Sequence, residues 1–133
     1  MPGYTRTVAK TTVLICDDAV LYATLLTHWF KDDPEIEVVG RVSTGREALE
    51  HAERLAPDVV VLDHMLPDAL SVELAPRLRA CAPRTAIVLV SGLTENALLE
   101  VADAIRAQAA VTKASTRDAL RAAILSTRAS SAP

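Results

Sequence analysis

Five short apolar runs, each followed by a segment of helical composition, constrain this chain more than any other feature. The runs cover residues 12–16, 36–42, 59–62, 85–90 and 109–112. Strands that alternate with helices predict a parallel sheet covered by helices on both faces. Because crossovers between parallel strands are right-handed, few topologies remain. The chain of 133 residues is therefore expected to form one α/β domain.

Helical spacing of apolar residues predicts where the intervening helices lie. They are expected over residues 19–31, 45–55, 70–80, 95–106 and about 117–127. Ser43 or Thr44 is a candidate cap for the second helix, and Ser115 or Thr116 for the last. Pro76 lies inside the third helix and predicts a kink or a later start there.

The segment VVVLDHMLPD, residues 59–68, places an acid at the end of an apolar run. Such a β-rich run is typical of a strand buried on both faces. An unpaired carboxylate costs several kcal/mol to bury. Asp63 is therefore expected where the strand leaves the core.

Polar residues stand just past four of the five expected strands. They are Asp17, Asp18, Asp63, Ser91 and Lys113. In an open parallel sheet, ligands bind at the carboxyl ends of the strands, near the switch point of the topology. We expect three acids, a hydroxyl and a lysine to meet at this edge, with Gly92 leaving room for a ligand.

This set of side chains suits the transfer of a phosphoryl group. Clustered carboxylates are hard ligands of the kind that Mg²⁺ prefers. A carboxylate can attack phosphorus and form an aspartyl phosphate, and a lysine supplies a fixed positive charge for the phosphoryl oxygens. The sequence predicts a Mg²⁺-dependent site with Asp63 as the nucleophile.

Composition excludes several other classes of protein. The net charge of −3 argues against a nucleic-acid-binding surface as the main function of the chain. No apolar run approaches the roughly 20 residues of a membrane helix, and residues 1–12 lack the apolar centre of a signal peptide. Cys16 and Cys81 are in no metal-binding pattern and are expected to be reduced thiols. A cytoplasmic protein is expected.

The ordered motifs VLICDD, VVVLDHMLPD, VLVSG and VTK resemble the receiver domain of two-component response regulators. The resemblance covers residues 12–127, so that 1–11 would be an N-terminal extension and 128–133 a flexible tail or the start of a linker. It implies a flavodoxin-like, doubly wound sheet of five parallel strands in the order 2-1-3-4-5.

The resemblance also assigns roles to individual residues. It implies that Asp63 is the phosphoacceptor, that Asp18 binds Mg²⁺ directly and that Asp17 helps through a water. The remaining roles fall to the backbone carbonyl of Met65 as a further metal ligand, to Ser91 as the switch hydroxyl and to Lys113 as the family's active-site lysine.

Partners are implied in the same way. A histidine kinase or a phosphotransfer protein would phosphorylate Asp63, and the chain would catalyse only its own phosphorylation and dephosphorylation. The segment 32–68 and the Lys113-Ala114-Ser115 sequence resemble receivers that carry a LuxR-type helix-turn-helix output. Dimerisation of two copies, or contact with such an output domain beyond residue 133, is the expected readout, with no direct binding of nucleic acid by this chain and no membrane contact.

Three positions depart from the family pattern. Ala110 stands where an aromatic usually precedes the lysine, and Arg106 and Ser71 stand where glycines are common. The missing aromatic motivates an alternative, a pseudo-receiver that acts as an interaction module without phosphorylation. A hydrolase related to haloacid dehalogenases is disfavoured, because the position of its general acid is held by Met65. His64, next to the acceptor, is interpreted as an exposed bystander.

Overall fold

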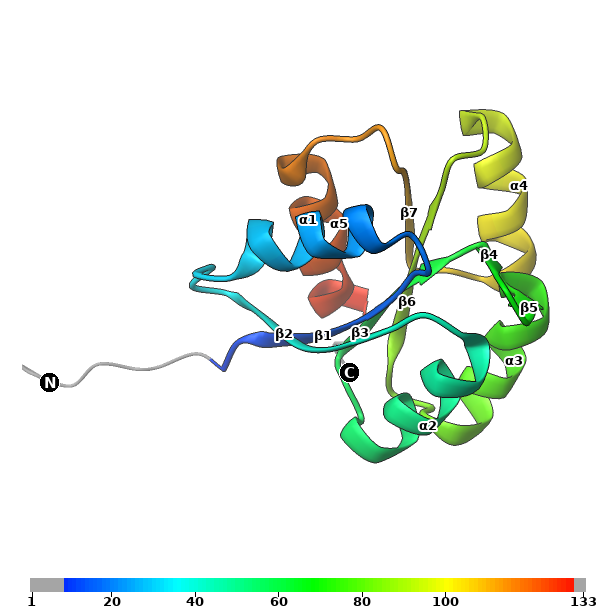
Figure 1. Cartoon of the computed structure of the whole chain (residues 1–133), viewed down its shortest axis with the longest axis horizontal. Helices are drawn as coiled ribbons and strands as arrows, with labels where there is room; N and C mark the ends of the chain where they lie inside the picture. The colour runs from blue at the N-terminus through cyan, green and yellow to red at the C-terminus, as the bar shows by residue number, and fades with distance from the viewer. Residues whose placement is uncertain (1–8, 131–133) are drawn as a thin grey trace, which may run out of the picture.

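A computed structural model describes residues 9–130, with side chains described as far as residue 128 (Figure 1). Its main sheet has the parallel strand order β2-β1-β3-β6-β7, which confirms the predicted five-stranded, doubly wound topology. The strands are β1 (Thr11–Cys16), β2 (Ile36–Val42), β3 (Val59–Asp63), β6 (Ala86–Ser91) and β7 (Ala109–Thr112).

Five helices cover the two faces of this sheet. They are α1 (Val20–Phe30), α2 (Gly45–Leu55), α3 (Ser71–Cys81), α4 (Glu95–Ile105) and α5 (Arg117–Ser130). Helices α1 and α5 pack on one face, while α2, α3 and α4 pack on the other (Figure 1). None of the helices in the described range 9–130 is long and apolar enough to cross a membrane.

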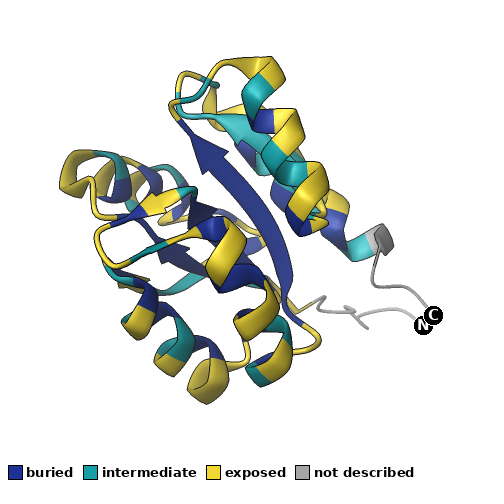
Figure 2. Ribbon diagram, turned by 90° about the vertical axis from the view of Figure 1, so that its right-hand side faces the viewer, coloured by how far each residue is buried: buried dark blue, intermediate teal, exposed yellow. Residues whose placement is uncertain are grey.

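The central strands β3 and β6 are buried along their whole length, as the apolar runs predicted. Figure 2 shows the centre of the sheet in dark blue, between helices whose outer surfaces are largely yellow. Each fully buried Val, Leu or Ile stabilises the fold by about 1.5–3 kcal/mol relative to an exposed one. This core fixes the sheet, and the sheet fixes where each strand ends.

A small antiparallel hairpin follows β3 and was not predicted. It consists of β4 (Met65–Leu66) and β5 (Ala69–Leu70), joined through Pro67 and Asp68. The Asp68 carboxylate accepts hydrogen bonds from the backbone N–H groups of Gly45 (2.6 Å) and Arg46 (3.0 Å) at the start of α2. The loop after β3 thus caps a helix that lies more than twenty residues earlier in the chain. Local capping is as predicted for Thr44, whose hydroxyl accepts from the N–H of Glu47.

Helix α3 begins before its proline, so the expected later start is wrong. The helix starts at Ser71 and continues through Pro76. Pro76 leaves the carbonyl of Val72 without its helical donor. Both residues are exposed, so water can reach that carbonyl.

The boundaries at both ends of the domain need correction. Strand β1 begins at Thr11, and α5 continues to Ser130, so residues 128–130 are not a frayed tail. Arg128 donates hydrogen bonds to the Thr11 hydroxyl (2.6 Å) and to the carbonyl of Ala9 (3.3 Å). Residues 1–8 and 131–133 of the predicted extension and tail lie outside the described residues.

Of the two predicted caps of α5, Thr116 is the one that the structure uses. The Thr116 hydroxyl accepts a hydrogen bond from the N–H of Ala119, whereas the Ser115 hydroxyl shares a hydrogen bond with the hydroxyl of Thr112.

Ala56 and Arg106 end α2 and α4 in the left-handed conformation, with φ of 45° and 54°. The turn before β7 therefore keeps the conformation that favours glycine, although Arg106 holds that position. A residue with a Cβ carries a conformational cost there of about 1–2 kcal/mol.

Replacing Ala56 by glycine should raise the free energy of unfolding by about 0.5–1 kcal/mol, because glycine adopts positive φ without a Cβ clash. Urea denaturation of the two proteins measures the difference. As a matched control, Ala104→Gly at an exposed position inside α4 should destabilise by about 1 kcal/mol. Loss of stability in both variants would contradict the role given to the left-handed turn.

A network of charges joins α5 to the α1–β2 connection. The buried carboxylate of Asp33 accepts hydrogen bonds from Arg121 Nε (2.8 Å) and from the N–H of Glu35 (2.8 Å) and Ile36 (3.1 Å). The Arg121 hydrogen bond is the main reason that the pKa of Asp33 lies below its ordinary value, against the opposing effect of burial. Glu35 in turn pairs with Arg121 and Arg128.

We expect Asp33→Asn to lower the free energy of unfolding at pH 7 by about 1–3 kcal/mol, because a buried charged hydrogen bond is lost. A carboxyl whose pKa is lowered by folding stabilises the fold above its unfolded pKa of about 4, and this contribution fades as the pH falls through the folded pKa. The deficit of the variant should therefore shrink between pH 5 and pH 3 in urea titrations. Asp32→Asn, at the exposed neighbouring residue, serves as the control and should change little. A deficit independent of pH would refute the electrostatic explanation.

Candidate functional site

The carboxyl edge of the sheet brings together the residues that the sequence singled out. Asp17 and Asp18 follow β1, Asp63 is the last residue of β3, Ser91 is the last of β6, and Lys113 follows β7. Pairing between neighbouring strands sets Cys16 beside Leu62, Asp63 beside Val90 and Ser91 beside Thr112. The strands therefore end at the same level, which places their terminal side chains around one site.

The three acids form one cluster. Asp17, Asp18 and Asp63 each offer a carboxylate oxygen, and these oxygens lie within 4.8 Å of one another. Asp17 and Asp63 are buried, whereas Asp18 is exposed. Two buried carboxylates at this separation repel each other and lose hydration, so the site requires positive charge.

Lys113 supplies that charge from β7. Its Nζ atom lies 2.8 Å from Asp17 Oδ2 and donates a hydrogen bond of 3.2 Å to Asp63 Oδ2. Burial alone would lower the pKa of Lys113, but the carboxylates of Asp17 and Asp63 outweigh this effect and raise it above the ordinary value. The lysine is therefore charged and held between the two buried acids.

The pKa of Asp63 is also raised above its ordinary value, but here burial raises it and the neighbouring lysine opposes the shift. Burial is the main cause and the carboxylate of Asp17 adds to it, while the Lys113 ammonium acts in the other direction. The same surroundings raise the pKa of Tyr22 to about 12, through burial and then the charges of Asp17 and Asp63. The site is thus a partly desolvated pocket with an excess of negative charge.

This donor set fits a divalent cation. Asp17 Oδ2 is fully buried, and the Lys113 ammonium at 2.8 Å is its close polar partner among the described residues. A hollow of about 200 Å³ lies beside Asp17 and Asp18 and reaches Arg41, Ser43 and Glu47. Oxygen-only ligands with open space for water are what Mg²⁺ prefers. The acidic pocket can therefore hold a metal, with Asp17, Asp18 and Asp63 as its side-chain ligands.

The remaining predicted residues border the cluster. The Ser91 hydroxyl is buried and accepts a hydrogen bond from the N–H of Leu93 (3.1 Å), which leaves its proton available to another acceptor. A Cβ built on Gly92 would meet no atom within 4 Å, so the structure gives no steric reason for glycine there. The Met65 N–H donates to Asp63 Oδ1 over 3.4 Å, while its carbonyl as a metal ligand stays a prediction.

His64 is not the exposed bystander that the sequence suggested. Its Nδ1 atom shares a hydrogen bond of 2.7 Å with the hydroxyl of Ser71, and the Ser71 N–H donates to the His64 carbonyl over 2.8 Å. Ser71 is fully buried. The serine at this departure from the family pattern thus anchors the residue that follows Asp63, a contact across the hairpin that local sequence does not reveal.

Tyr22 is the site residue that the sequence reasoning missed. Its ring centre lies 5.0 Å from Lys113 Nζ, which is a cation–π contact. The available signal was its position: Tyr22 lies in the first turn of α1, which begins two residues after Asp18.

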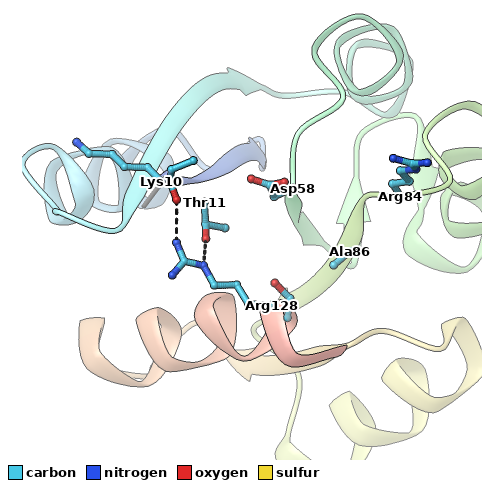
Figure 3. A pocket seen from close by; sticks show the side chains of 8 residues that line it. Lys10, Thr11, Asp58, Arg84, Ala86 and Arg128 are labelled. Carbon is cyan, nitrogen blue, oxygen red and sulfur yellow. Dashed lines mark hydrogen bonds between the residues drawn. The ribbon is translucent and has the colours of Figure 1, made fainter. Parts of the chain in front are cut away.

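A separate hollow of about 390 Å³ lies at the opposite, amino-terminal edge of the sheet (Figure 3). Lys10, Arg84 and Arg128 line it together with Asp58. Asp58 already accepts hydrogen bonds from the backbone and hydroxyl of Thr12, and Arg128 is bound to Thr11. The cluster of Asp17, Asp18 and Asp63 and the side chain of Lys113 lie at the carboxyl edge of the sheet, away from this hollow.

Comparison with known proteins bears on the family and the fold of the chain. The model of the response regulator receiver domain matches residues 13–125. A protein-glutamate methylesterase/protein-glutamine glutaminase from Nocardioides sp. is 36% identical over 97 residues, which cover 73% of this chain but 26% of that protein. The chain thus spans about a quarter of the length of that relative.

Solved structures show the same fold. The signal receiver domain of the putative response regulator NarL from Mycobacterium tuberculosis has a TM-score of 0.83 at 28% identity, covering 90% of this chain and 97% of that one. A two-component response regulator of the LuxR family from Aurantimonas sp. has the same TM-score of 0.83 at 23% identity, covering 92% of this chain and 87% of its own, and supports the fold alone.

The family match over residues 13–125 and the shared five-stranded fold agree with each other. The chain belongs to the response regulator receiver domain family.

Proposed function

We propose that this receiver domain accepts a phosphoryl group on Asp63 in a Mg²⁺-dependent reaction, and that phosphorylation shifts its conformational equilibrium. The observation that carries this proposal is the position of Asp63. Its carboxylate lies at the strand end, within 4.8 Å of two further acids and 3.2 Å from the Lys113 ammonium. That combination of nucleophile, metal ligands and fixed cation is what phosphoryl transfer requires.

The chain's own residues perform distinct parts of the reaction. A carboxylate oxygen of Asp63 forms the new bond to phosphorus as the bond between phosphorus and the donor breaks, and the donor leaves with that electron pair. Lys113 is positioned to pair with a phosphoryl oxygen, and Ser91 can donate its hydroxyl proton to another. Bound Mg²⁺ would neutralise charge on the phosphoryl oxygens and relieve the repulsion among Asp17, Asp18 and Asp63.

The donor we propose is a phosphohistidine of a histidine kinase or of a phosphotransfer protein in the cytoplasm. The chain itself would catalyse only its own phosphorylation and dephosphorylation. The support is the family membership together with the absence of any acid two residues after Asp63, where Met65 stands.

The readout we propose is dimerisation or contact with an output domain, through a surface built on α1 and α5. Support comes from the apolar side chains of α1, where Val20 is 70% and Leu21 87% exposed. The Nocardioides methylesterase contains a segment similar to this chain that covers 26% of its length, so most of that protein lies outside the matched segment. A helix-turn-helix output beyond residue 133 is the candidate suggested by the resemblance of residues 32–68 to receivers of the LuxR type.

A pseudo-receiver that works without phosphorylation is the second candidate. Ala110 favours it, because a methyl group cannot make the inward movement that the resemblance assigns to an aromatic there. The buried, metal-compatible acids oppose it, since such a cluster costs stability without a ligand. Magnesium affinity and phosphorylation of Asp63 separate the two candidates.

The direct test is intact-protein mass after incubation with Mg²⁺ and acetyl phosphate. Wild-type protein should gain the mass of one phosphoryl group, because Asp63 is the nucleophile at the centre of the cluster. Asp63→Asn should gain nothing, as should wild-type protein without magnesium. The exposed Asp32→Asn variant, which keeps the acid cluster, should react like the wild type. A folded wild-type protein that binds no magnesium and gains no mass would favour the pseudo-receiver.

A second test uses the competition between Lys113 and the metal for the same carboxylates. Lys113→Ala should bind Mg²⁺ more tightly by roughly tenfold, because one positive charge next to Asp17 and Asp63 is removed. Isothermal titration calorimetry measures the affinity. Lys31→Ala removes the same charge from an exposed position and should leave the affinity nearly unchanged. Equal affinities in all three proteins would mean that magnesium does not bind at this cluster.

A further inference from the structure

Lys113 interacts with three groups at once, and one of them has no part in the chemistry described so far. Its ammonium lies 2.8 Å from Asp17 and 3.2 Å from Asp63, and 5.0 Å from the ring centre of Tyr22. The lysine side chain is 24% exposed, so it has little room to move without changing its contacts. Any shift of the ammonium between its carboxylates also changes its contact with the tyrosine ring.

Such a shift is expected when the site is occupied. A metal that binds Asp17 competes with the ammonium for the same buried oxygen, and a phosphoryl group on Asp63 adds about two negative charges on the other side. The first change displaces Lys113 from Asp17, and the second draws it toward the phosphoryl group on Asp63. The cation–π contact depends on the position of the charge over the ring, so this movement weakens or redirects it.

Tyr22 lies on α1, so a change in its contact with Lys113 reaches this helix. The first turn of α1 also has a hydrogen bond to the site. The Asp17 carboxylate accepts a hydrogen bond of 2.8 Å from the N–H of Ala19, the residue that caps α1. Asp17 and Tyr22 are thus two links between the site and the first turn of α1. In this turn Ala23 is buried and Tyr22 is partly buried against the core on this face of the sheet, while Leu26 and Phe30 pack further along the helix.

The outer face of that turn is apolar and open. Val20 and Leu21 are 70% and 87% exposed, and Leu25 one turn later is 40% exposed. By contrast, Ala110 on β7 is partly buried against the core under α2, α3 and α4, and its methyl group makes no polar or aromatic contact with the site among the described residues. Of the aromatic side chains that the structure describes, Tyr22 is the one in contact with Lys113.

We propose that Tyr22 is a positioning residue that reads the state of the site through Lys113, so that the first turn of α1 is the surface that changes when Asp63 is phosphorylated. This inference rests on the proposed phosphorylation of Asp63. The coupling requires the ring and not the hydroxyl, because the contact with the ammonium is made by the face of the ring.

Hydrogen–deuterium exchange of the α1 amides tests the coupling. Exchange is compared with and without Mg²⁺ and beryllofluoride, a mimic of the phosphoryl group, in the full chain. Wild type and Tyr22→Phe should show the same change in exchange over Val20–Phe30, since both keep the ring. Tyr22→Met should lose that change. Trp29→Met is the matched control, because Trp29 lies on the same helix and packs on Phe30 instead of Lys113, and it should retain the change.

Intact mass after acetyl phosphate treatment, measured on the same proteins, separates the two proposals. A phosphoryl adduct on Tyr22→Met together with lost α1 coupling supports the inference. An adduct with full coupling in Tyr22→Met, or an adduct on wild type without any change in α1, overturns it and leaves the proposed function intact. No adduct on the folded wild type would remove the proposed function and this inference with it.

A measurement on a protein with an intact Tyr22 guards against a Tyr22→Met variant that does not fold. Ring-labelled tyrosine NMR, with Tyr4→Phe to assign the Tyr22 signal, should show the ring resonances of Tyr22 shifting when beryllofluoride and Mg²⁺ are added. Resonances that stay unchanged while the amides of the site shift would overturn the inference.

Discussion

One ammonium group among buried carboxylates is the interaction on which the carboxyl edge of this sheet depends. Lys113 from the end of β7 reaches Asp17 after β1 and Asp63 at the end of β3, and so joins strands from both sides of the topological switch point. Without it, two carboxylates would be buried without a counter-charge, which proteins rarely tolerate. The cluster still holds three acids for this one lysine. The edge is therefore stable enough to fold and still suited to a cation.

The two edges of the sheet use charge in different ways. At the carboxyl edge, one cation serves a cluster of three acids, and a ligand can redistribute it. Away from that site, Asp33 is saturated by Arg121 and two backbone N–H groups, and Arg128 joins α5 to the start of β1. Charged groups whose hydrogen bonds are all made within the protein hold α5 in place. Helix α1 is different, since its first turn contacts the site itself through Ala19 and Tyr22.

Much of the fold could be predicted because its signals are local. The bounds of β2, α2 and β7 agree with the sequence patterns, since apolar periodicity and caps such as Thr44 act over one or two turns. The hairpin after β3 was missed because two-residue strands carry no periodic signal. The later start predicted for α3 from Pro76 was wrong. Pro76 lies on the exposed side of the helix, where water can reach the carbonyl of Val72, and only the packing of the helix decides which side is exposed.

The sequence by itself determined which residues end each strand, and therefore that Asp17, Asp18, Asp63, Ser91 and Lys113 would meet at one edge. Parallel strands covered by helices leave no other place for polar residues directly after apolar runs. Only the tertiary structure decided which of these groups touch and what else joins them. The contacts of Tyr22 with Lys113, of Asp68 with α2 and of Ser71 with His64 connect segments whose separation is set by packing. Such contacts depend on distances between elements, and the spacing of residues along a single element does not encode them.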